Sequence, residues 1–427
     1  MNGVRTAYAV AAVGWAAFVA VGSLVPFDFE SRSWSDAVET FTRVVTTRPT
    51  TISKSDTLTN LLLGVPLGFA LLGAVFAGRW ASTASVLAVG VLLLPVCAAF
   101  SSAVEFAQLF APGRVCSGVD VLAQVVGAAA GMVAWLLFGR WFTAQAVAAA
   151  TGTEPASRLL VAYVFLLGLM QALPLDFNSS PADAYRKFRD GEVKPIPFAE
   201  FRTLTADGQA KAVADLVQLA LLYAPVGLLA ACVPGRFWGR RNVVGVLLAA
   251  LALALAMELG QVLVRSRTCK GTDVVLGGLA AFAGWAVGHG FRRGLKSGRI
   301  MLLGAVWGGA LLWVSWWPLR TGGAPAFDWT PGMPLQGRNP LWTLEALLAK
   351  LVLFGLAGAL VAARPGVARP PAFATPLVLG LATSAVCEAG QTYFAGHTPG
   401  ITDVILGGLG ALCGAWVATR VRARIAS

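Results

Sequence analysis

The chain has 427 residues, of which 57% are hydrophobic and 13% charged, and its mean hydropathy is +0.70. These values exclude an ordinary soluble globular protein, in which about a quarter of the residues are charged. The formal net charge of +12 would by itself suggest a nucleic-acid partner, but the basic residues cluster in short loops between apolar runs, so we expect none. Apolar runs of about 20 residues, long enough to cross a bilayer, recur along the whole sequence. We therefore predict an all-α polytopic membrane protein.

The first 150 residues predict four membrane helices. The first apolar run, over residues 8–25, follows a single charge at Arg5 and is followed by further membrane segments, so we interpret it as a retained helix and not as a cleaved signal peptide. A long polar loop then reaches Lys54. The remaining helices are predicted to begin near Asp56 and to cover residues 85–110 and 119–138.

The same order recurs twice more. After a first helix that ends at Pro174 and a charged loop that reaches Lys211, residues 151–298 predict helices over 215–228, 243–264 and 273–289. Residues 299–427 predict a first helix ending at Trp317, then helices over 344–360, 376–393 and 401–417. The total is about twelve transmembrane helices in three repeats, 1–150, 151–298 and 299–427. Because each repeat has an even number of helices, the three repeats should be parallel.

A spaced motif identifies the repeats. In each copy a Glu is followed after three residues by a Gln and, twelve residues after the Gln, by an Asp, with a basic or imidazole side chain six residues before the Asp. Three identical spacings indicate an internal triplication. The residues are Glu105, Gln108, Arg114 and Asp120; Glu258, Gln261, Arg267 and Asp273; and Glu388, Gln391, His397 and Asp403.

The motif allows two interpretations. Glu and Gln lie on one helix face, and the Asp begins the next helix after a tight turn, so the polar groups converge at one depth in the membrane. An ionisable group in an apolar helix indicates a functional site, with Glu105, Glu258 and Glu388 as general acid/base candidates, Gln and the basic residue orienting a ligand, and Asp holding charge. Alternatively, the Asp caps its helix, Glu and Gln brace the hairpin, and the Arg pairs with a carboxylate.

Neither a metal nor a cofactor is indicated. The chain has two His and six Cys residues and lacks the Cys/His spacings of a zinc site. Cys116 and Cys269 occupy matching positions four residues before the Asp, and a disulfide between them is one alternative that this match supports only weakly.

The distribution of Lys and Arg predicts the orientation of the helices. With both termini on the cytoplasmic side, the cytoplasmic loops and tail would be basic and almost free of acids, whereas the opposite loops mix both charges. The motif would then lie at the extracytoplasmic ends of its helices. The cytoplasmic basic residues would be Arg79, Arg140, Arg158, Arg236, Arg240, Arg241, Arg292, Arg293, Lys296, Arg299, Arg364, Arg369, Arg420, Arg422 and Arg424.

These residues resemble the VanZ-like family of membrane proteins. The family pattern has an Asp and an Asn before Pro-Leu-Gly in one helix, followed by Glu-x-x-Gln, an Arg and an Asp. Asp56, Asn60 and Pro66 match its first part in the first repeat, and Asp215 and Pro225 match it in the second. The third repeat departs most, with Lys350 in place of Asn60 and Arg320 in place of an earlier Asp. If the sites are catalytic, we expect the third to be degenerate.

The resemblance implies a multi-pass protein of the bacterial cytoplasmic membrane that serves the cell envelope, since the founding type is associated with low-level teicoplanin resistance. We expect polar sites that bind or modify a lipid-linked or glycopeptide-like amphiphile; whether the protein is an enzyme stays open. The alternatives are a membrane transporter and a non-catalytic scaffold whose polar clusters only brace the hairpins. The sequence does not indicate an oligomeric state.

Overall fold

A computed structural model gives the arrangement of the chain. It describes residues 2–24, 27–47, 54–79, 81–112, 114–151, 155–174, 176, 178, 181–202, 204–292, 297–320, 326–332, 340–362 and 374–425. These residues form fourteen α-helices, one 3-10 helix and two short strands. They divide into two compact units, the first comprising 1–147 and 332–340 and the second comprising 148–331 and 341–427.

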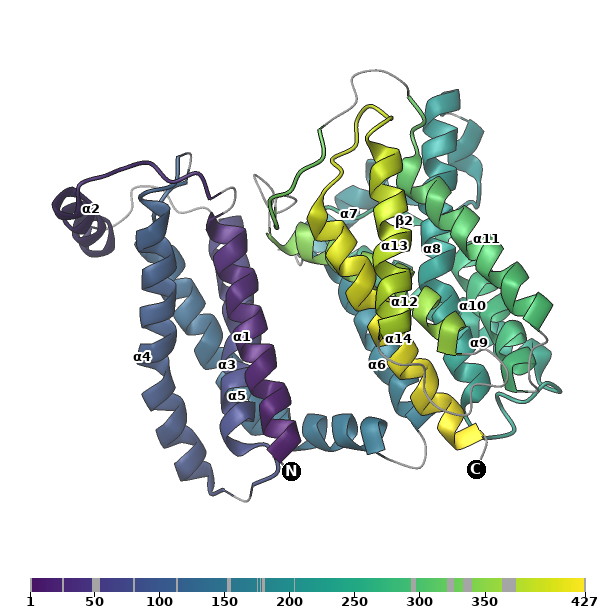
Figure 1. Cartoon of the computed structure of the whole chain (residues 1–427), viewed down its shortest axis with the longest axis horizontal. Coiled ribbons are helices and arrows are strands. Elements are labelled where there is room, and N and C mark those ends of the chain that lie inside the picture. Colours follow the sequence, from purple (N-terminus) through teal and green to yellow (C-terminus); the bar gives the residue numbers. More distant parts are fainter. Residues whose placement is uncertain are drawn as a thin grey trace. The chain divides into compact units, whose positions relative to one another are not determined.

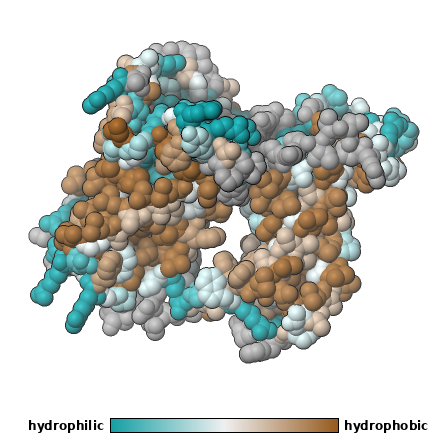
Figure 2. Space-filling view, turned by 180° about the vertical axis from the view of Figure 1, so that it is seen from behind, coloured by the Kyte–Doolittle hydropathy of each residue, from teal (hydrophilic) through white to brown (hydrophobic). Residues whose placement is uncertain are grey.

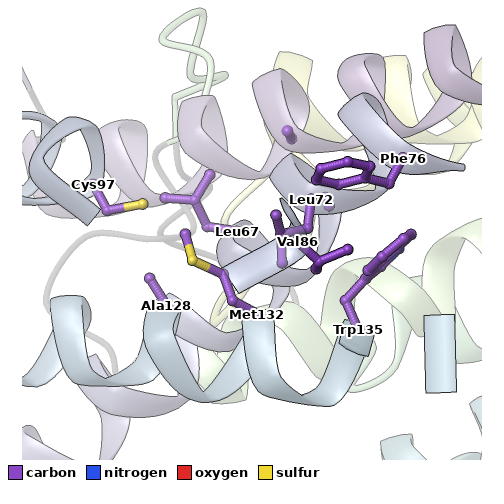
Figure 3. Close-up of a cluster of buried hydrophobic side chains, with 10 residues drawn as sticks. Leu67, Leu72, Phe76, Val86, Cys97, Ala128, Met132 and Trp135 are labelled. Carbon is purple, nitrogen blue, oxygen red and sulfur yellow. The ribbon is translucent and has the colours of Figure 1, made fainter. Parts of the chain in front are cut away.

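The first unit is a bundle of four long helices with one short helix (Figure 1). Its elements are α1 (Asn2–Leu24), α2 (Trp34–Thr46), α3 (Lys54–Phe76), α4 (Thr83–Gln108) and α5 (Gly118–Thr151). Apolar side chains of α3, α4 and α5 meet in its interior, where Leu67 and Leu72 lie beside Met132 and Trp135 (Figure 3). The four predicted helices of the first repeat thus form one packed bundle.

The second unit holds the two remaining repeats. In it α10 packs against both α8 and α9, and α13 packs against α14 (Figure 1). A strand pair joins β1 to β2 in parallel. The elements are α6 (Pro155–Ala172), α7 (Pro181–Arg189), β1 (Val193–Lys194), η1 (Ala199–Arg202), α8 (Ala206–Cys232), α9 (Val243–Gln261), β2 (Cys269–Lys270), α10 (Gly271–Arg292), α11 (Ser297–Trp316), α12 (Pro340–Ala362), α13 (Ala374–Gln391) and α14 (Ile401–Ile425).

Eleven of the described helices are long and apolar enough to cross a membrane. The prediction of an all-α polytopic membrane protein is confirmed. The twelfth predicted span is α13, which at 18 residues forms a helix but is not apolar enough to be counted with the others. Large apolar side chains such as Leu92, Phe165 and Met301 are more than 70% exposed, as lipid-facing residues are. In Figure 2 the apolar side chains cover the flanks of each unit, and hydrophilic ones gather toward the helix ends.

The observed helices differ from the predictions at several places, one of which is α14, which continues from the predicted end at residue 417 to Ile425. Helix α5 continues beyond residue 138 to Thr151, because the Ala-rich stretch that follows has high helix propensity. Helix α8 begins at Ala206, nine residues before Asp215, where Thr205 accepts a hydrogen bond from the amide of Gly208 as an N-cap. The two polar loops contain the amphipathic helices α2 and α7, which a search for long apolar runs does not detect.

Glycines bring the second and fourth helices of each repeat into backbone contact. A Cβ atom added to Gly68, Gly227 or Gly358 would lie 1.7–1.9 Å from a carbonyl oxygen of the fourth helix. The reverse holds for Gly131, Gly284 and Gly414, whose added Cβ would lie 1.7–2.1 Å from a carbonyl of the second helix. Small residues let membrane helices approach closely. The glycine positions correspond in all three repeats, so the three helix pairs cross in the same way.

An aromatic side chain of the first helix also bonds the second helix in each repeat. The acceptor is always a backbone carbonyl, and the three acceptors stand at corresponding positions. Trp15 donates to Leu63 at 2.7 Å, Tyr163 to Leu222 at 2.7 Å and Trp307 to Leu353 at 3.0 Å. This shared contact extends the structural correspondence to the third repeat.

Candidate functional site

The Glu of each motif lies buried at the end of the third helix of its repeat and is 1–3% exposed. Its carboxylate accepts a hydrogen bond from the backbone amide twelve residues later, in the residue that immediately precedes the fourth helix. The first amides of a helix have no partner within the helix, and a carboxylate at this end also interacts favourably with the helix dipole. The Glu therefore fixes the turn to the start of the fourth helix. The bonds join Glu105 to Ser117 at 2.9 Å, Glu258 to Lys270 at 2.9 Å and Glu388 to Gly400 at 3.0 Å.

The Gln of the motif supports the Glu in the first two repeats. Gln261 donates to Glu258 Oε1 at 2.8 Å. With the amide orientation that satisfies both its oxygen and its nitrogen, Gln108 donates to Glu105 Oε2 at 3.2 Å and to the Val115 carbonyl at 3.3 Å. In the third repeat Gln391 instead donates to the carbonyl of Ser315 in α11, at 3.0 Å. The third site thus differs in its hydrogen bonding.

The Asp of the motif is the third residue of the fourth helix. The N-cap residue is the one immediately before the helix, and its backbone amide donates to the Glu. The Asp is therefore not the N-cap residue. Asp120 and Asp273 are half-buried, whereas Asp403 is 4% exposed. The Asp residues are therefore available for another role in the first two repeats.

In the first repeat Asp120 belongs to a cluster of carboxylates and amides. Asp56, an exposed residue in the first turn of α3, interacts electrostatically with Asp120, and Asn60 lies next to it. The side chain of Gln124 donates to Asn60 Oδ1 at 2.8 Å, and Asn60 donates to the carbonyl of Asp56 at 3.1 Å. These side chains come from α3 and α5, which the glycine contacts hold together. The cluster offers hydrogen-bond acceptors at the end of a membrane helix pair.

The second repeat surrounds its Asp with charges of both signs. Asp273 interacts with Lys270 and with the carboxylates of Asp215 and Glu200. Next to it the hydroxyl of Thr272 donates to Glu200 Oε1 at 2.8 Å. The site therefore extends from α8 and α10 to η1, in the segment that precedes α8.

In the third repeat the charge of the motif Asp is neutralised by an ion pair within the protein. Lys350 forms an ion pair with Asp403 Oδ2, and the hydroxyl of Ser384 donates to the Asp403 backbone carbonyl at 2.8 Å. Among the described residues, Asp403 Oδ1 is buried without a hydrogen-bond partner. Lys350 stands where the first repeat has Asn60, so the departure noted in the sequence creates an ion pair within the site.

The basic residue of the motif caps the first helix of its repeat. Its side chain reaches the backbone carbonyls at the C-terminal end of that helix, which have no partners within the helix. Arg267 also forms an ion pair with Glu345 of α12, a carboxylate outside its own hairpin. The capping bonds join Arg114 to Gly22 at 3.2 Å, Arg267 to Met170 at 3.2 Å and to Leu173 at 2.9 Å, and His397 to Trp316 at 3.1 Å.

The segment between α6 and α8 supplies contacts that the sequence did not reveal. Lys187 of α7 is 5% exposed and donates to the carbonyls of Gln261, at 3.3 Å, and of Val264, at 2.5 Å, at the end of α9. Burial lowers the pKa of its ammonium group. These contacts span more than 70 residues, so no local pattern could have predicted them.

All six cysteines are free thiols. Cys116 is buried in the turn beside Glu105, and burial together with the carboxylates of Glu105 and Asp120 raises its pKa to about 12. Burial likewise raises the pKa of Cys269, with Glu258 as a further cause. Within the described part of the chain, no group of three or more His, Cys, Asp or Glu side chains could hold a metal ion.

Comparison with known proteins links these sites to one family. The profile of the VanZ/LLP1 family matches residues 7–139 and 160–292. The two matched regions contain the complete motifs of the first and second repeats. No curated protein and no solved structure matches the chain.

Proposed function

The chain belongs to the VanZ/LLP1 family, and from this premise we propose that it binds a lipid-linked or glycopeptide-like amphiphile in the bacterial cell envelope. In this proposal it is a multi-pass protein of the cytoplasmic membrane with both termini on the cytoplasmic side, and its Glu/Gln/Asp clusters face the extracytoplasmic surface. A role in teicoplanin resistance belongs to the same proposal.

One observation carries the proposal. In the first two repeats the half-buried Asp of the motif lies beside a second, exposed Asp from the neighbouring membrane helix, at the helix end where a headgroup would lie. An ionisable group in a membrane segment is costly and is a functional-site hypothesis by default. The pairs Asp56–Asp120 and Asp215–Asp273 would accept hydrogen bonds from hydroxyl or ammonium groups of the ligand.

The proposal gives the Glu residues a structural role and not ligand contact. Both oxygens of Glu258 accept hydrogen bonds within the protein, one from Lys270 and one from Gln261. Such a carboxylate is better placed to hold the turn than to exchange protons with a ligand. We therefore assign Glu105, Glu258 and Glu388 to positioning the Asp-bearing helix, and we assign ligand contact to the Asp residues.

The third repeat would contribute little to binding. Its Asp403 is buried and already paired with Lys350, so no carboxylate is left to meet a ligand. The proposal therefore places two working sites, and not three, in the chain.

The test compares envelope protection among Asp variants in a host that lacks the gene. Wild type, Asp120→Asn, Asp273→Asn and the double variant are expressed in that host, and sensitivity to teicoplanin and membrane abundance are measured. We expect partial loss of protection in each single variant and near-complete loss in the double variant. The matched control is Asp190→Asn, an exposed loop carboxylate that is 52% accessible.

Two outcomes would contradict the proposal. If the double variant protects as well as wild type at equal abundance, the Asp residues do not act on the ligand. If Glu105→Gln and Glu258→Gln abolish protection while thermal stability and abundance are unchanged, the Glu residues act directly and the positioning role is wrong.

A further inference from the structure

A cavity of about 360 Å³ lies in the second unit, where the start of α8 meets the end of α11. We refer to it as the α8–α11 cavity. Its polar lining carries charges of both signs, and its apolar lining includes an indole ring. The residues that define it are Asp207, Lys211, Asp215, Gln218, Trp317 and Arg320.

The charges of the cavity alternate along one face of α8. Asp207, Lys211 and Asp215 are spaced four residues apart, so their side chains follow one another on the same side of the helix. Arg320 approaches from the segment after α11 and forms an ion pair with Asp207. Lys211 and Asp215 are exposed and interact electrostatically one turn apart. The cavity therefore presents cationic and anionic groups in close succession.

The cavity lies at the boundary of the membrane. The candidate spans include Ala206–Cys232, which begins at the cavity, and Gly298–Trp316, which ends there. Trp317 stacks on Trp313 with ring centroids 5.1 Å apart, and tryptophans are enriched at this depth. A molecule in the cavity would have a polar end among the charges and an apolar end along α8 and α11.

The charge pair is not part of the common repeat architecture. At the positions that correspond to Lys211 and Asp215, the first repeat has Ile52 and Asp56. The third repeat has Trp342 and Ala346 there. Packing of the second helix therefore does not require the pair. A feature specific to the second repeat needs an explanation specific to it.

We propose that the α8–α11 cavity binds a phospholipid whose headgroup is a phosphate ester carrying a primary ammonium group, as in phosphatidylethanolamine. Lys211 and Arg320 would bind the phosphate oxygens, and Asp215 would accept hydrogen bonds from the ammonium. A purely anionic headgroup would meet Asp207 and Asp215, and a purely cationic one would meet Lys211 and Arg320. Only a zwitterion matches both sets of charges.

The inference deepens the proposed function, on which it rests, because Asp215 belongs to both sites. It names the headgroup chemistry for one of them. The experiment must therefore separate lipid binding at the cavity from binding at Asp120 and Asp273.

The test uses the purified full chain in nanodiscs and three photoactivatable phospholipids with a diazirine in the acyl chain. The headgroups are phosphoethanolamine, phosphocholine and phosphoglycerol, and the labelled peptides are located by mass spectrometry. We expect the phosphoethanolamine lipid to label 207–218 and 314–320 several-fold more than the other two. Lys211→Gln or Asp215→Asn should lower this labelling about tenfold, as the loss of a charge-assisted hydrogen bond would. The control is Lys194→Gln, an exposed lysine outside the cavity.

A charge-swapped variant distinguishes the loss of lipid binding from misfolding. The double change Lys211→Asp and Asp215→Lys keeps both charges, so it should recover much of the labelling that the single variants lose. Soluble O-phosphoethanolamine is added as a competitor. If it lowers the labelling, the cavity also binds the soluble phosphate ester; if it does not, the cavity binds the headgroup only as part of a lipid.

Other outcomes would overturn the inference. Equal labelling by the phosphoglycerol lipid would mean an anion site, and equal labelling by the phosphocholine lipid would mean that the ammonium is not recognised by hydrogen bonds. Labelling near Asp120 and Asp273 without labelling of the cavity would overturn this inference and leave the proposed function standing. No labelling at any of these positions would also overturn this inference, whereas the proposed function is tested separately by the protection assay.

Discussion

The carboxylate of Glu258 and the backbone amide of Lys270 are hydrogen-bonded at 2.9 Å, across the turn that separates α9 from α10. The same relationship joins Glu105 to Ser117 and Glu388 to Gly400. A buried carboxylate that serves a helix start in this way belongs to the architecture of the hairpin. It explains why the Glu is retained in the third repeat, where His397 replaces the Arg and Lys350 replaces Asn60.

Replacement of Glu258 by Ala should therefore destabilise the hairpin. It leaves the Lys270 amide and the Gln261 side chain without their acceptor, at a cost of about 1–3 kcal/mol for each buried polar group left unsatisfied. Hydrogen exchange at Lys270 should accelerate and the Tm should fall. Glu258→Gln keeps one acceptor oxygen and should have a smaller effect, whereas Glu39→Ala, at a side chain that is 72% exposed on α2, should leave both readouts near wild type. Unchanged exchange at Lys270 in Glu258→Ala would contradict the bracing role.

The close crossing of α8 and α10 predicts a severe effect of one methyl group. In Gly227→Ala the new Cβ would lie 1.7 Å from the carbonyl oxygen of Ala281, so the helices must separate. Overpacking of this kind costs about 1–3 kcal/mol or more, and the Tm should fall accordingly. Gly260→Ala in α9 is the control, because nothing lies within 4 Å of its added Cβ. Equal stability of the two variants would mean that the crossing is looser than described.

The ion pair of the third repeat predicts strong coupling between its two residues. Lys350→Met leaves the buried carboxylate of Asp403 uncompensated, which costs about 3–5 kcal/mol when a buried pair is broken. Asp403→Asn in the same chain removes the stranded charge, so the double variant should be much closer to wild type than Lys350→Met alone. Thermal unfolding of wild type, both single variants and the double variant gives the coupling directly. Additive losses would contradict a direct pair.

The thiol of Cys116 should resist alkylation. Its pKa is about 12, well above that of a free cysteine at about 8.5, so little thiolate is present near neutral pH and the thiol stays protonated until the pH approaches 12. In the unfolded protein the alkylation rate should reach a plateau above about pH 9, while in the folded protein it should still rise between pH 9 and 11. Labelling with iodoacetamide followed by peptide mass spectrometry measures both rates. A plateau near pH 9 in the folded protein would contradict the raised pKa.

Much of the fold could be predicted because it depends on local signals. Apolar runs gave the twelve helices, and the repeated spacing from Glu to Asp marked corresponding turns in all three repeats. The glycines at Gly131, Gly284 and Gly414 follow each Asp by eleven residues, and small residues at helix contacts are typical of membrane proteins, which agrees with their close contacts to the second helix. The family resemblance is confirmed by a profile that matches the first two repeats.

The partners of the motif residues were harder to predict. Arg114 and His397 form hydrogen bonds that no local pattern indicates, since these bonds reach carbonyls of the first helix 92 and 81 residues away. Lys187 shows the same limit, since nothing in the sequence around α7 indicates that its ammonium is buried against the end of α9. Spacing reveals which residues share a turn. It does not reveal which distant helix end faces that turn.

The capping of the first helix by the last turn of its repeat has a consequence for biogenesis. Translation delivers Gly22 long before Arg114, and Met170 long before Arg267, which follows it by 97 residues. During synthesis, the backbone carbonyls at the C-terminal end of the newly inserted first helix therefore lack their Arg donor until the third helix and its turn have emerged from the ribosome. Each repeat should leave the insertion machinery as a unit of four helices, and chains truncated before Arg114 or Arg267 should be preferred substrates for membrane quality control.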